Sequence, residues 1–232
     1  MDHQTENYRL SVALLVALAF CIYLPMKAAP FVYEDVRWLG AVNQEILWTW
    51  PSRALTNLTF QLQAELPVSF GLPISPLSFH ILNVGIHLVN SVLIAIIALP
   101  MIGRLGSVFA SGMFALHPLM TEAVSYVAVR GDLLLTCCAL VALWGLRNGH
   151  RGLMVAAVAV ILAGWTKEIG VVIMALMLWT CLIYRQHVKL MGYGAGVVAL
   201  LWLVQWPTFS AWMTLPVYAG GSSLSWADFF GT

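Results

Sequence analysis

Two adjacent carboxylates, Glu34 and Asp35, stand shortly after the first apolar run of the chain, which covers residues 10–24. They lie where the chain is expected to leave an apolar environment. A carboxylate at such a boundary can act as a general base that takes the proton of a hydroxyl group. The alternative interpretation is a pair of solvated loop acids close to Arg37.

The largest group of ionisable residues lies between His117 and Asp132. Within it, Glu122, Tyr126 and Arg130 recur at steps of four residues, so a helix over this stretch would place them on one face. Ionisable residues next to apolar runs indicate a functional site. The alternative is a network of Glu122 and Arg130 that only holds loops together.

Lys167 and Glu168 join two later apolar runs. The lysine could bind a phosphate group as a point charge. Alternatively, it could form a turn in which it pairs with Glu168. The sequence leaves both interpretations open.

The second apolar run carries a stripe of polar residues at His80, Asn83, His87 and Asn90. Their spacing puts them on one helix face, and polar residues of a membrane helix face other protein rather than lipid. For the deeper pair, His87 and Asn90, we expect hydrogen bonds between helices, whereas His80 could equally line a site. No carboxylate accompanies the two histidines, and the four cysteines lack metal-ligand spacing. We therefore predict neither a metal nor a cofactor.

The composition indicates the environment in which these residues work. Of the 232 residues, 61% are hydrophobic and only 9% are charged, against about 25% charged residues in an ordinary soluble domain. Too little polar surface remains for a soluble enzyme, a disordered chain or a nucleic-acid-binding protein. The apolar runs do not alternate as barrel strands do. We predict an all-α fold, a polytopic transmembrane helical bundle that forms one domain over residues 1–232.

The apolar runs give about seven candidate transmembrane spans, at residues 10–24, 81–102, 105–116, 133–146, 153–164, 169–184 and 190–206. The connections at 104, 147–151 and 185–189 carry basic residues and no acid. Because basic residues favour the cytoplasmic side, the N-terminus is predicted to be cytoplasmic. The longer segments 25–79, 117–132 and 207–232 are then predicted on the periplasmic or luminal side of an integral, multi-pass membrane protein.

The first outer segment shows the pattern of amphipathic helices that lie in the membrane interface. Val36, Leu39, Val42 and Ile46 recur at helical spacing and are followed by tryptophans, and a second such piece is expected around Leu58.

The third and fifth spans are short, and they end at polar residues. Each has about a dozen residues, too few for a full crossing, and they end at His117 and at Lys167. We expect an outer face that is hollowed, with these residues recessed below the lipid headgroups. Helix tilt, or a Lys167 side chain that reaches to the interface, is the alternative.

Four stretches, taken in chain order, resemble the motifs of one family. They are Phe31-Val32-Tyr33-Glu34-Asp35, the polar stripe of the second run, residues 114–134 with the core His117-Pro118-Leu119-Met120-Thr121-Glu122-Ala123-Val124, and Lys167-Glu168-Ile169-Gly170. In this order they resemble the multi-spanning glycosyltransferases of the GT-C fold. The resemblance is to the O-mannosyltransferase family that combines transmembrane helices with C-terminal tetratricopeptide repeats, and it covers most of residues 20–185.

The resemblance implies the transfer of a sugar, mannose, from a polyprenyl-phosphate carrier to a hydroxyl group of a protein or glycan acceptor at the outer face, with inversion. The implied base is Asp35, together with Glu34. The implied ligands of the donor phosphate are the cations His117, Arg130 and Lys167. The residues that would support these groups are Glu122, Asp132, Glu168 and His80.

Two departures from the family pattern keep another function open. The acid pair is Glu34-Asp35 where the family has two aspartates, and no tetratricopeptide period is present. The chain can therefore also be interpreted as a truncated or inactive relative that acts as an accessory subunit of a larger membrane complex, because an incomplete bundle would leave polar faces in lipid. A transporter or channel would need an ionisable path, and the deep polar residues form only the stripe of the second run.

Overall fold

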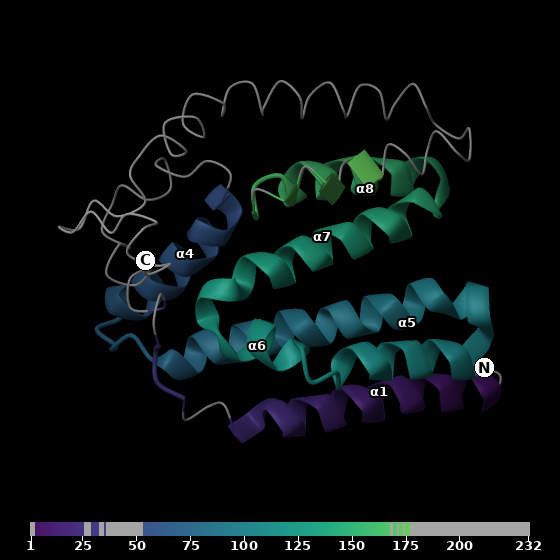
Figure 1. Ribbon diagram of the computed structural model, residues 1–232, viewed down its shortest axis with the longest axis horizontal. Coiled ribbons are helices and arrows are strands. Elements are labelled where there is room, and N and C mark those ends of the chain that lie inside the picture. The colour runs from purple at the N-terminus through teal and green to yellow at the C-terminus, as the bar shows by residue number, and fades with distance from the viewer. Residues whose placement is uncertain are drawn as a thin grey trace, which may run out of the picture.

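The computed structural model describes residues 3–25, 29–32, 35, 53–167, 169–170, 172–173 and 175–176. This part of the chain is helical and contains no strand, as predicted for an all-α protein. Its elements are α1 (His3–Tyr23), α4 (Ala54–Ser69), α5 (Pro76–Ala115), α6 (Met120–Ser125), the 3-10 helix η3 (Val127–Val129), α7 (Arg130–Leu146) and α8 (Gly149–Ala163) (Figure 1).

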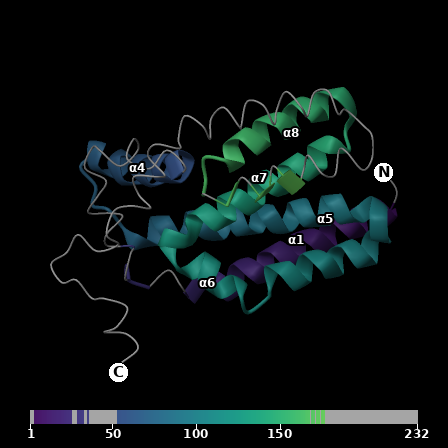
Figure 2. The same ribbon diagram turned by 45° about the horizontal axis from the view of Figure 1, so that its top comes forward.

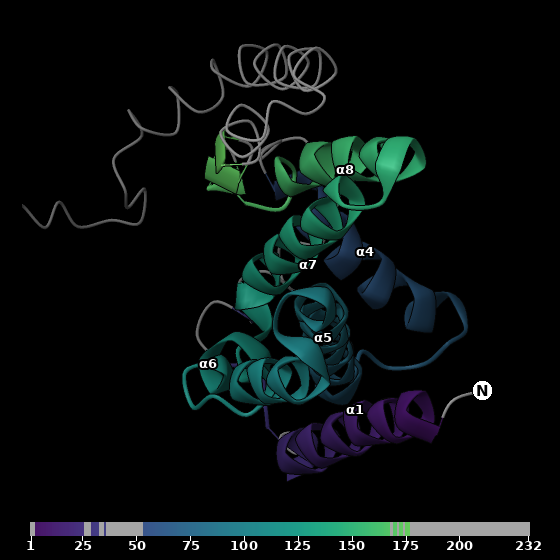
Figure 3. The ribbon, with the colours of Figure 1, turned by 90° about the vertical axis from the view of Figure 1, so that its right-hand side faces the viewer.

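The long helices pack side by side in the order α1, α5, α7, α8, as the view along the bundle in Figure 3 shows. Three stretches are long and apolar enough to cross a membrane: His3–Tyr23, Pro76–Ala115 and Val127–Leu146. Helix α1 exposes Leu10, Leu14 and Leu18, an apolar surface suited to lipid. The described residues thus have the structure of a helical membrane protein. The count of seven spans and the GT-C fold stay predictions, and the run at 190–206 lies outside the described residues.

Helix α5 folds back on itself at Gly103. This residue has a φ of 72°, a left-handed conformation that glycine adopts without strain. Ser111 Oγ donates to the carbonyl of Ser91 over 2.6 Å, and His87 Nε2 donates to the carbonyl of Ala115 over 3.1 Å. In one straight helix, Ser91 and Ser111 would be about 30 Å apart. The second and third predicted runs are therefore two antiparallel helices, with the break next to the Arg104 that predicted it.

The turn of α5, the start of α1 and the α7–α8 connection lie at one end of the bundle (Figures 1 and 2). Two arginines of these connections bind neighbouring elements there. Arg104 Nη1 donates to Gln4 Oε1 over 2.6 Å, and Arg147 Nη1 donates to the Ile97 carbonyl over 2.8 Å. Helices α4 and α6 lie at the opposite end, so the structure separates the basic connections from the stretch between His117 and Asp132.

The polar stripe of α5 faces the protein interior, as predicted. His80, Asn83, His87 and Asn90 are all buried. Asn90 Nδ2 donates to the Leu133 carbonyl over 3.0 Å, which ties α5 to α7. Together with the bond from His87 to Ala115, this confirms that the deeper pair joins helices.

Helix α4 confirms a helix within residues 25–79, the segment that is predicted to lie on the outer side. It buries Thr56, Phe60 and Ala64, while Leu58 and Leu62 are exposed. The exposed leucines agree with the predicted amphipathic pattern, while Phe60 on the buried face packs against Phe79 of α5. The other amphipathic helix, predicted over residues 36–46, lies outside the described residues.

Candidate functional site

Three segments far apart in the chain meet at the end of the bundle that holds α4. Leu55 N, in the first turn of α4, donates to the Trp165 carbonyl over 2.8 Å. Thr56 Oγ1 donates to the Thr166 carbonyl over 2.7 Å. Gly131, at the start of α7, allows the same turn to come close, because a Cβ atom there would lie 3.0 Å from the Thr166 carbonyl oxygen. The start of α4, the turn after α8 and the start of α7 thus form one junction.

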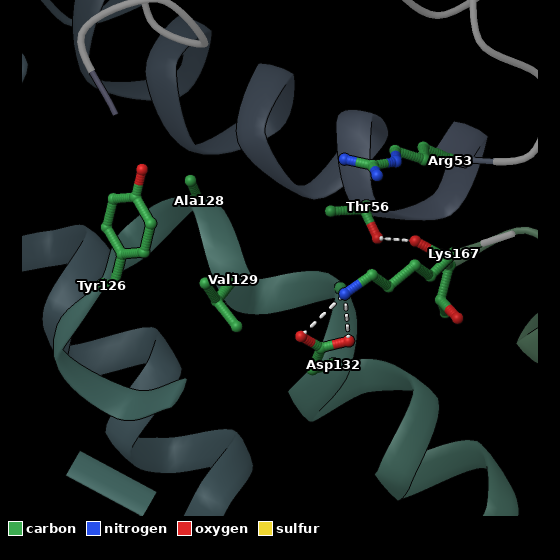
Figure 4. A pocket seen from close by; sticks show the side chains of 9 residues that line it. Arg53, Thr56, Tyr126, Ala128, Val129, Asp132 and Lys167 are labelled. Atoms are coloured by element: carbon green, nitrogen blue, oxygen red, sulfur yellow. Dashed lines mark hydrogen bonds and ion pairs between the residues drawn. The ribbon is translucent and has the colours of Figure 1, made fainter. Parts of the chain in front are cut away.

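This junction surrounds a pocket of about 150 Å³ (Figure 4). Such a volume exceeds the roughly 10–15 Å³ needed for a single water molecule, so the pocket has room for a small polar group. Its lining residues are Arg53, Thr56, Tyr126, Ala128, Val129, Gly131, Asp132, Thr166 and Lys167.

Lys167 and Asp132 form an ion pair inside the pocket, although 35 residues separate them in the chain. Lys167 Nζ lies 2.7 Å from Asp132 Oδ1 and 2.9 Å from Oδ2. Both side chains remain more than a third exposed, at 35% and 38%. The ammonium group is therefore held in a defined place and is still accessible to a ligand.

The packing around Gly170, three residues after Lys167, requires a glycine. Gly170 N donates to the Lys167 carbonyl over 2.9 Å, which closes a tight turn. A Cβ atom at Gly170 would overlap the carbonyl oxygen of Ala163. This turn carries Lys167 back over the end of α8 and into the pocket.

Arg53 also lines the pocket, and the sequence reasoning missed it. It is the residue directly before α4, and Figure 4 shows Arg53 and Asp132 on different sides of the pocket. A signal was present, because Arg53 is a cation inside a segment predicted to be on the outer side, where basic residues are disfavoured.

Arg130, in contrast, is fully buried and directed away from the pocket. Its Nε donates to Asn83 Oδ1 over 2.8 Å, and its Nη2 donates to the Phe79 carbonyl over 3.3 Å. A third bond of 3.4 Å joins Nη1 to Thr59 Oγ1. The guanidinium also lies 4.3 Å from the centre of the Phe60 ring, a distance typical of a cation–π interaction. Arg130 thereby connects α7 with α4 and α5.

Asp35 is also buried, with 1% of its surface exposed. Its Oδ1 accepts a hydrogen bond of 2.7 Å from Ala128 N, and its Oδ2 accepts one of 3.2 Å from Val32 N. Its negative charge attracts the positively charged guanidinium of Arg130. Asp35 does not line the described pocket, although Ala128, to which it is bonded, does. Glu34 lies outside the described residues.

One prediction about this region is wrong: Glu122, Tyr126 and Arg130 do not share a helix face. Helix α6 ends at Ser125, and Tyr126 has an extended conformation with a ψ of 110°. The bend lets Val124 and Val127 enter two different apolar clusters. Burial of these side chains outweighs a continuous helix, and it separates Glu122 from Arg130.

The remaining predicted site residues lie apart from the pocket or outside the described residues. The Nδ1 atom of His117 accepts a hydrogen bond of 3.2 Å from Leu119 N, and Glu122 is exposed on α6. Neither residue lines the pocket. His80 is buried, and both of its ring nitrogens lack a hydrogen-bond partner among the described residues. Glu168 lies outside them.

The geometry describes a helical membrane protein with a small charged pocket at one end of its bundle. Comparison with known proteins gives its relatives. The chain is 32% identical over 148 residues to Protein O-mannosyl-transferase Tmtc1 of Drosophila melanogaster, a match that covers 54% of this chain and 17% of that protein. It is 30% identical over 145 residues to Tmtc2 of the same organism and 31% identical over 144 residues to human TMTC3, each match covering 53% of this chain and 15% of the relative.

These matches confirm the predicted resemblance to O-mannosyltransferases over about half of the chain. The chain spans less than a fifth of the length of these relatives. No family model matches the chain, and no solved structure matches it.

Proposed function

We propose that this chain is an O-mannosyltransferase-like membrane protein that transfers mannose from a polyprenyl-phosphate donor to a hydroxyl group of a protein or glycan. The observation that carries the proposal is the pocket in which Lys167 is held by Asp132, at the end of an apolar bundle. The relatives are named as O-mannosyltransferases, which supports this class of reaction.

In this proposal Lys167 binds the donor phosphate and stabilises it as it leaves. A preorganised cation lowers the barrier of such a transfer, because negative charge develops on the departing phosphate oxygen. Asp132 keeps the ammonium group in place before the donor arrives. His117 and Arg130 stay predicted phosphate ligands, but the described contacts of Arg130 are all inside the protein.

Asp35 is the proposed general base, with Glu34 beside it in sequence. The acceptor oxygen would attack the anomeric carbon of mannose, and the bond from this carbon to the phosphate oxygen would break. The electron pair leaves with the phosphate, and the carboxylate takes the acceptor proton. Asp35 lies next to the pocket lining, because its Oδ1 accepts a hydrogen bond from Ala128 N and Ala128 lines the pocket.

The proposed orientation puts the pocket on the periplasmic or luminal side. The connections that carry Arg104 and Arg147 lie at the opposite end of the bundle, and basic connections favour the cytoplasmic side. The acceptor would then meet the donor phosphate on the outer face of the membrane. Other membrane subunits are proposed partners of the bundle.

A second candidate function is that of a non-catalytic accessory subunit. The observation that favours it is the burial of Asp35 and Arg130, whose polar groups bind partners within the chain. Buried and satisfied polar groups of this kind also occur where they only specify packing.

Transfer of labelled mannose by the full chain in lipid vesicles separates the two functions. The donor is polyprenyl-phosphate mannose, and the acceptors are hydroxyl-bearing peptides and oligosaccharides. We expect transfer by the unaltered chain and none by Asp35→Asn, while Arg151→Gln, at an exposed arginine of α8, transfers normally. Binding of the donor without transfer by any variant would contradict the enzyme and support the accessory subunit.

A further inference from the structure

Asp132 and Thr56 give the pocket a lining with hydrogen-bond acceptors. Figure 4 shows both carboxylate oxygens of Asp132 bonded to Lys167 Nζ, at 2.7 and 2.9 Å. Thr56 lines the same pocket, and its Oγ1 donates its proton to the Thr166 carbonyl over 2.7 Å. A hydroxyl group whose proton is used in this way offers only lone pairs to a ligand. A ligand that contacts Asp132 or Thr56 must therefore supply hydrogen-bond donors.

The ion pair leaves part of the hydrogen-bonding capacity of Asp132 and Lys167 unused. An ionised carboxylate has about four lone-pair sites, and an ammonium group has three N–H donors. Lys167 Nζ occupies two of the carboxylate sites and uses two of its own donors to do so. About two acceptor sites of Asp132 and one donor of Lys167 remain, and both side chains are more than a third exposed.

The two side chains accept different groups of a ligand. A carboxylate repels a phosphate, so the phosphate binds to the remaining donor of Lys167, whereas the acceptor sites of Asp132 suit neutral hydroxyl groups. We propose that Asp132 binds hydroxyl groups of a sugar in this pocket while Lys167 binds the adjoining phosphate. The assignment of this sugar as the mannose of the donor rests on the proposed function. Asp132 is then a ligand of the substrate as well as the residue that holds Lys167.

The junction fixes the backbone that carries Asp132 and leaves room for the sugar hydroxyls. A Cβ atom at Gly131 would lie 3.0 Å from the Thr166 carbonyl oxygen and 3.4 Å from Thr56 Oγ1. The residue before Asp132 is thus in close contact with two other walls of the pocket. The pocket volume of about 150 Å³ is roughly ten times the 10–15 Å³ that one water molecule needs, which is enough for several hydroxyl groups.

Binding of two lipid diesters to the full chain in nanodiscs tests this proposal without any transfer reaction. One is polyprenyl-phosphate mannose, and the other is polyprenyl methyl phosphate, which has the same single negative charge but no sugar hydroxyls. Native mass spectrometry gives the ratio of the two affinities in one sample, so a partly unfolded sample affects both lipids equally. The unaltered chain should prefer the mannose lipid. Asp132→Asn should reduce this preference at least about tenfold, because a hydrogen bond to a charged acceptor is lost.

Two further variants separate sugar binding from a general effect of the charge. Asp132→Glu keeps the carboxylate and should keep more of the preference than Asp132→Asn. The matched control is Glu65→Gln, which removes an exposed carboxylate of α4 that does not line the pocket and should leave the ratio unchanged. Polyprenyl methyl phosphate should bind Asp132→Asn at least as well as the unaltered chain, because a negative charge is removed. An equal loss for both lipids, or an unchanged ratio, would overturn the proposal.

Methyl mannoside, added to the chain saturated with polyprenyl methyl phosphate, distinguishes the donor's sugar from an acceptor glycan. No binding of methyl mannoside, with an Asp132-dependent preference for the mannose lipid, supports the donor's sugar. Asp132-dependent binding of methyl mannoside, with no preference between the lipids, would overturn the assignment to the donor in favour of an acceptor glycan. An Asp132-dependent preference without any transfer of mannose would overturn the proposed enzyme and leave this proposal standing. Transfer with an unchanged ratio in Asp132→Asn would do the reverse.

Discussion

Arg130 and Lys167 carry the same charge at the same end of the bundle, yet their surroundings differ. Arg130 is fully buried and bonded to Asn83, Phe79 and Thr59. Lys167 is partly exposed and faces a pocket in which Asp132 holds it. The comparison teaches that a cation in a motif can stabilise a helix junction or receive a ligand, and that burial distinguishes the two roles.

The largest expected effect is on stability, from Arg130→Leu. The substitution leaves the buried carboxylate of Asp35 and the Asn83 amide oxygen without this partner, and breaking a buried charge network costs about 3–5 kcal/mol. Thermal unfolding of the purified chain, followed by circular dichroism, measures it. If Arg130→Leu unfolds at the wild-type temperature and loses only phosphate binding, the two cations do not differ as described.

The opposite pattern is expected for Lys167→Gln. Polyprenyl-phosphate binding should fall by about tenfold to a hundredfold, which corresponds to one charged hydrogen bond. Stability should change by at most about 1 kcal/mol, because ion pairs that are this exposed contribute little. Native mass spectrometry and thermal unfolding of the same sample give both values. A large loss of stability with unchanged binding would show that Lys167 stabilises the fold, as Arg130 does, and does not bind the phosphate.

A smaller effect is expected from Gly131→Ala, which alters the pocket wall without changing charge. The new methyl group would press on the Thr166 carbonyl oxygen at 3.0 Å and on Thr56 Oγ1 at 3.4 Å. We expect a loss of about 1 kcal/mol in stability and weaker phosphate binding. The matched control is Gly85→Ala in α5, where nothing lies within 4 Å of the added atom. Equal effects of the two substitutions would contradict the close junction.

The smallest effect is expected from Asn90→Leu, far from the pocket. It removes the bond from Nδ2 to the Leu133 carbonyl, and single hydrogen bonds between membrane helices contribute about 0.6 kcal/mol on average. Thermal unfolding should show a small shift, and phosphate binding should not change. Reduced phosphate binding in this variant would show that the stripe of α5 reaches the site.

The sequence predicted those features that depend on local spacing. The break beside Arg104 follows from a charge between two apolar runs, and the burial of the α5 stripe follows from its helical period. The pairing of Lys167 with Asp132 was not predicted as such, but both residues were identified as members of one site.

The features that sequence reasoning missed depend on contacts between distant segments. Arg53 enters the pocket because Leu55 and Thr56 bind the turn at 165–166, and no local pattern shows these bonds. The bend at Tyr126 arises because Val124 and Val127 pack into different clusters. Tertiary packing of this kind overrides the four-residue spacing that suggested a continuous helix.

The most direct test of the central claim is an experimental structure of the full chain with bound polyprenyl phosphate. The account predicts the phosphorus atom inside the pocket, with a phosphate oxygen at hydrogen-bond distance from Lys167 Nζ, and Arg130 still bonded to Asn83. A phosphate bound to Arg130, with Lys167 remote from it, would contradict the account.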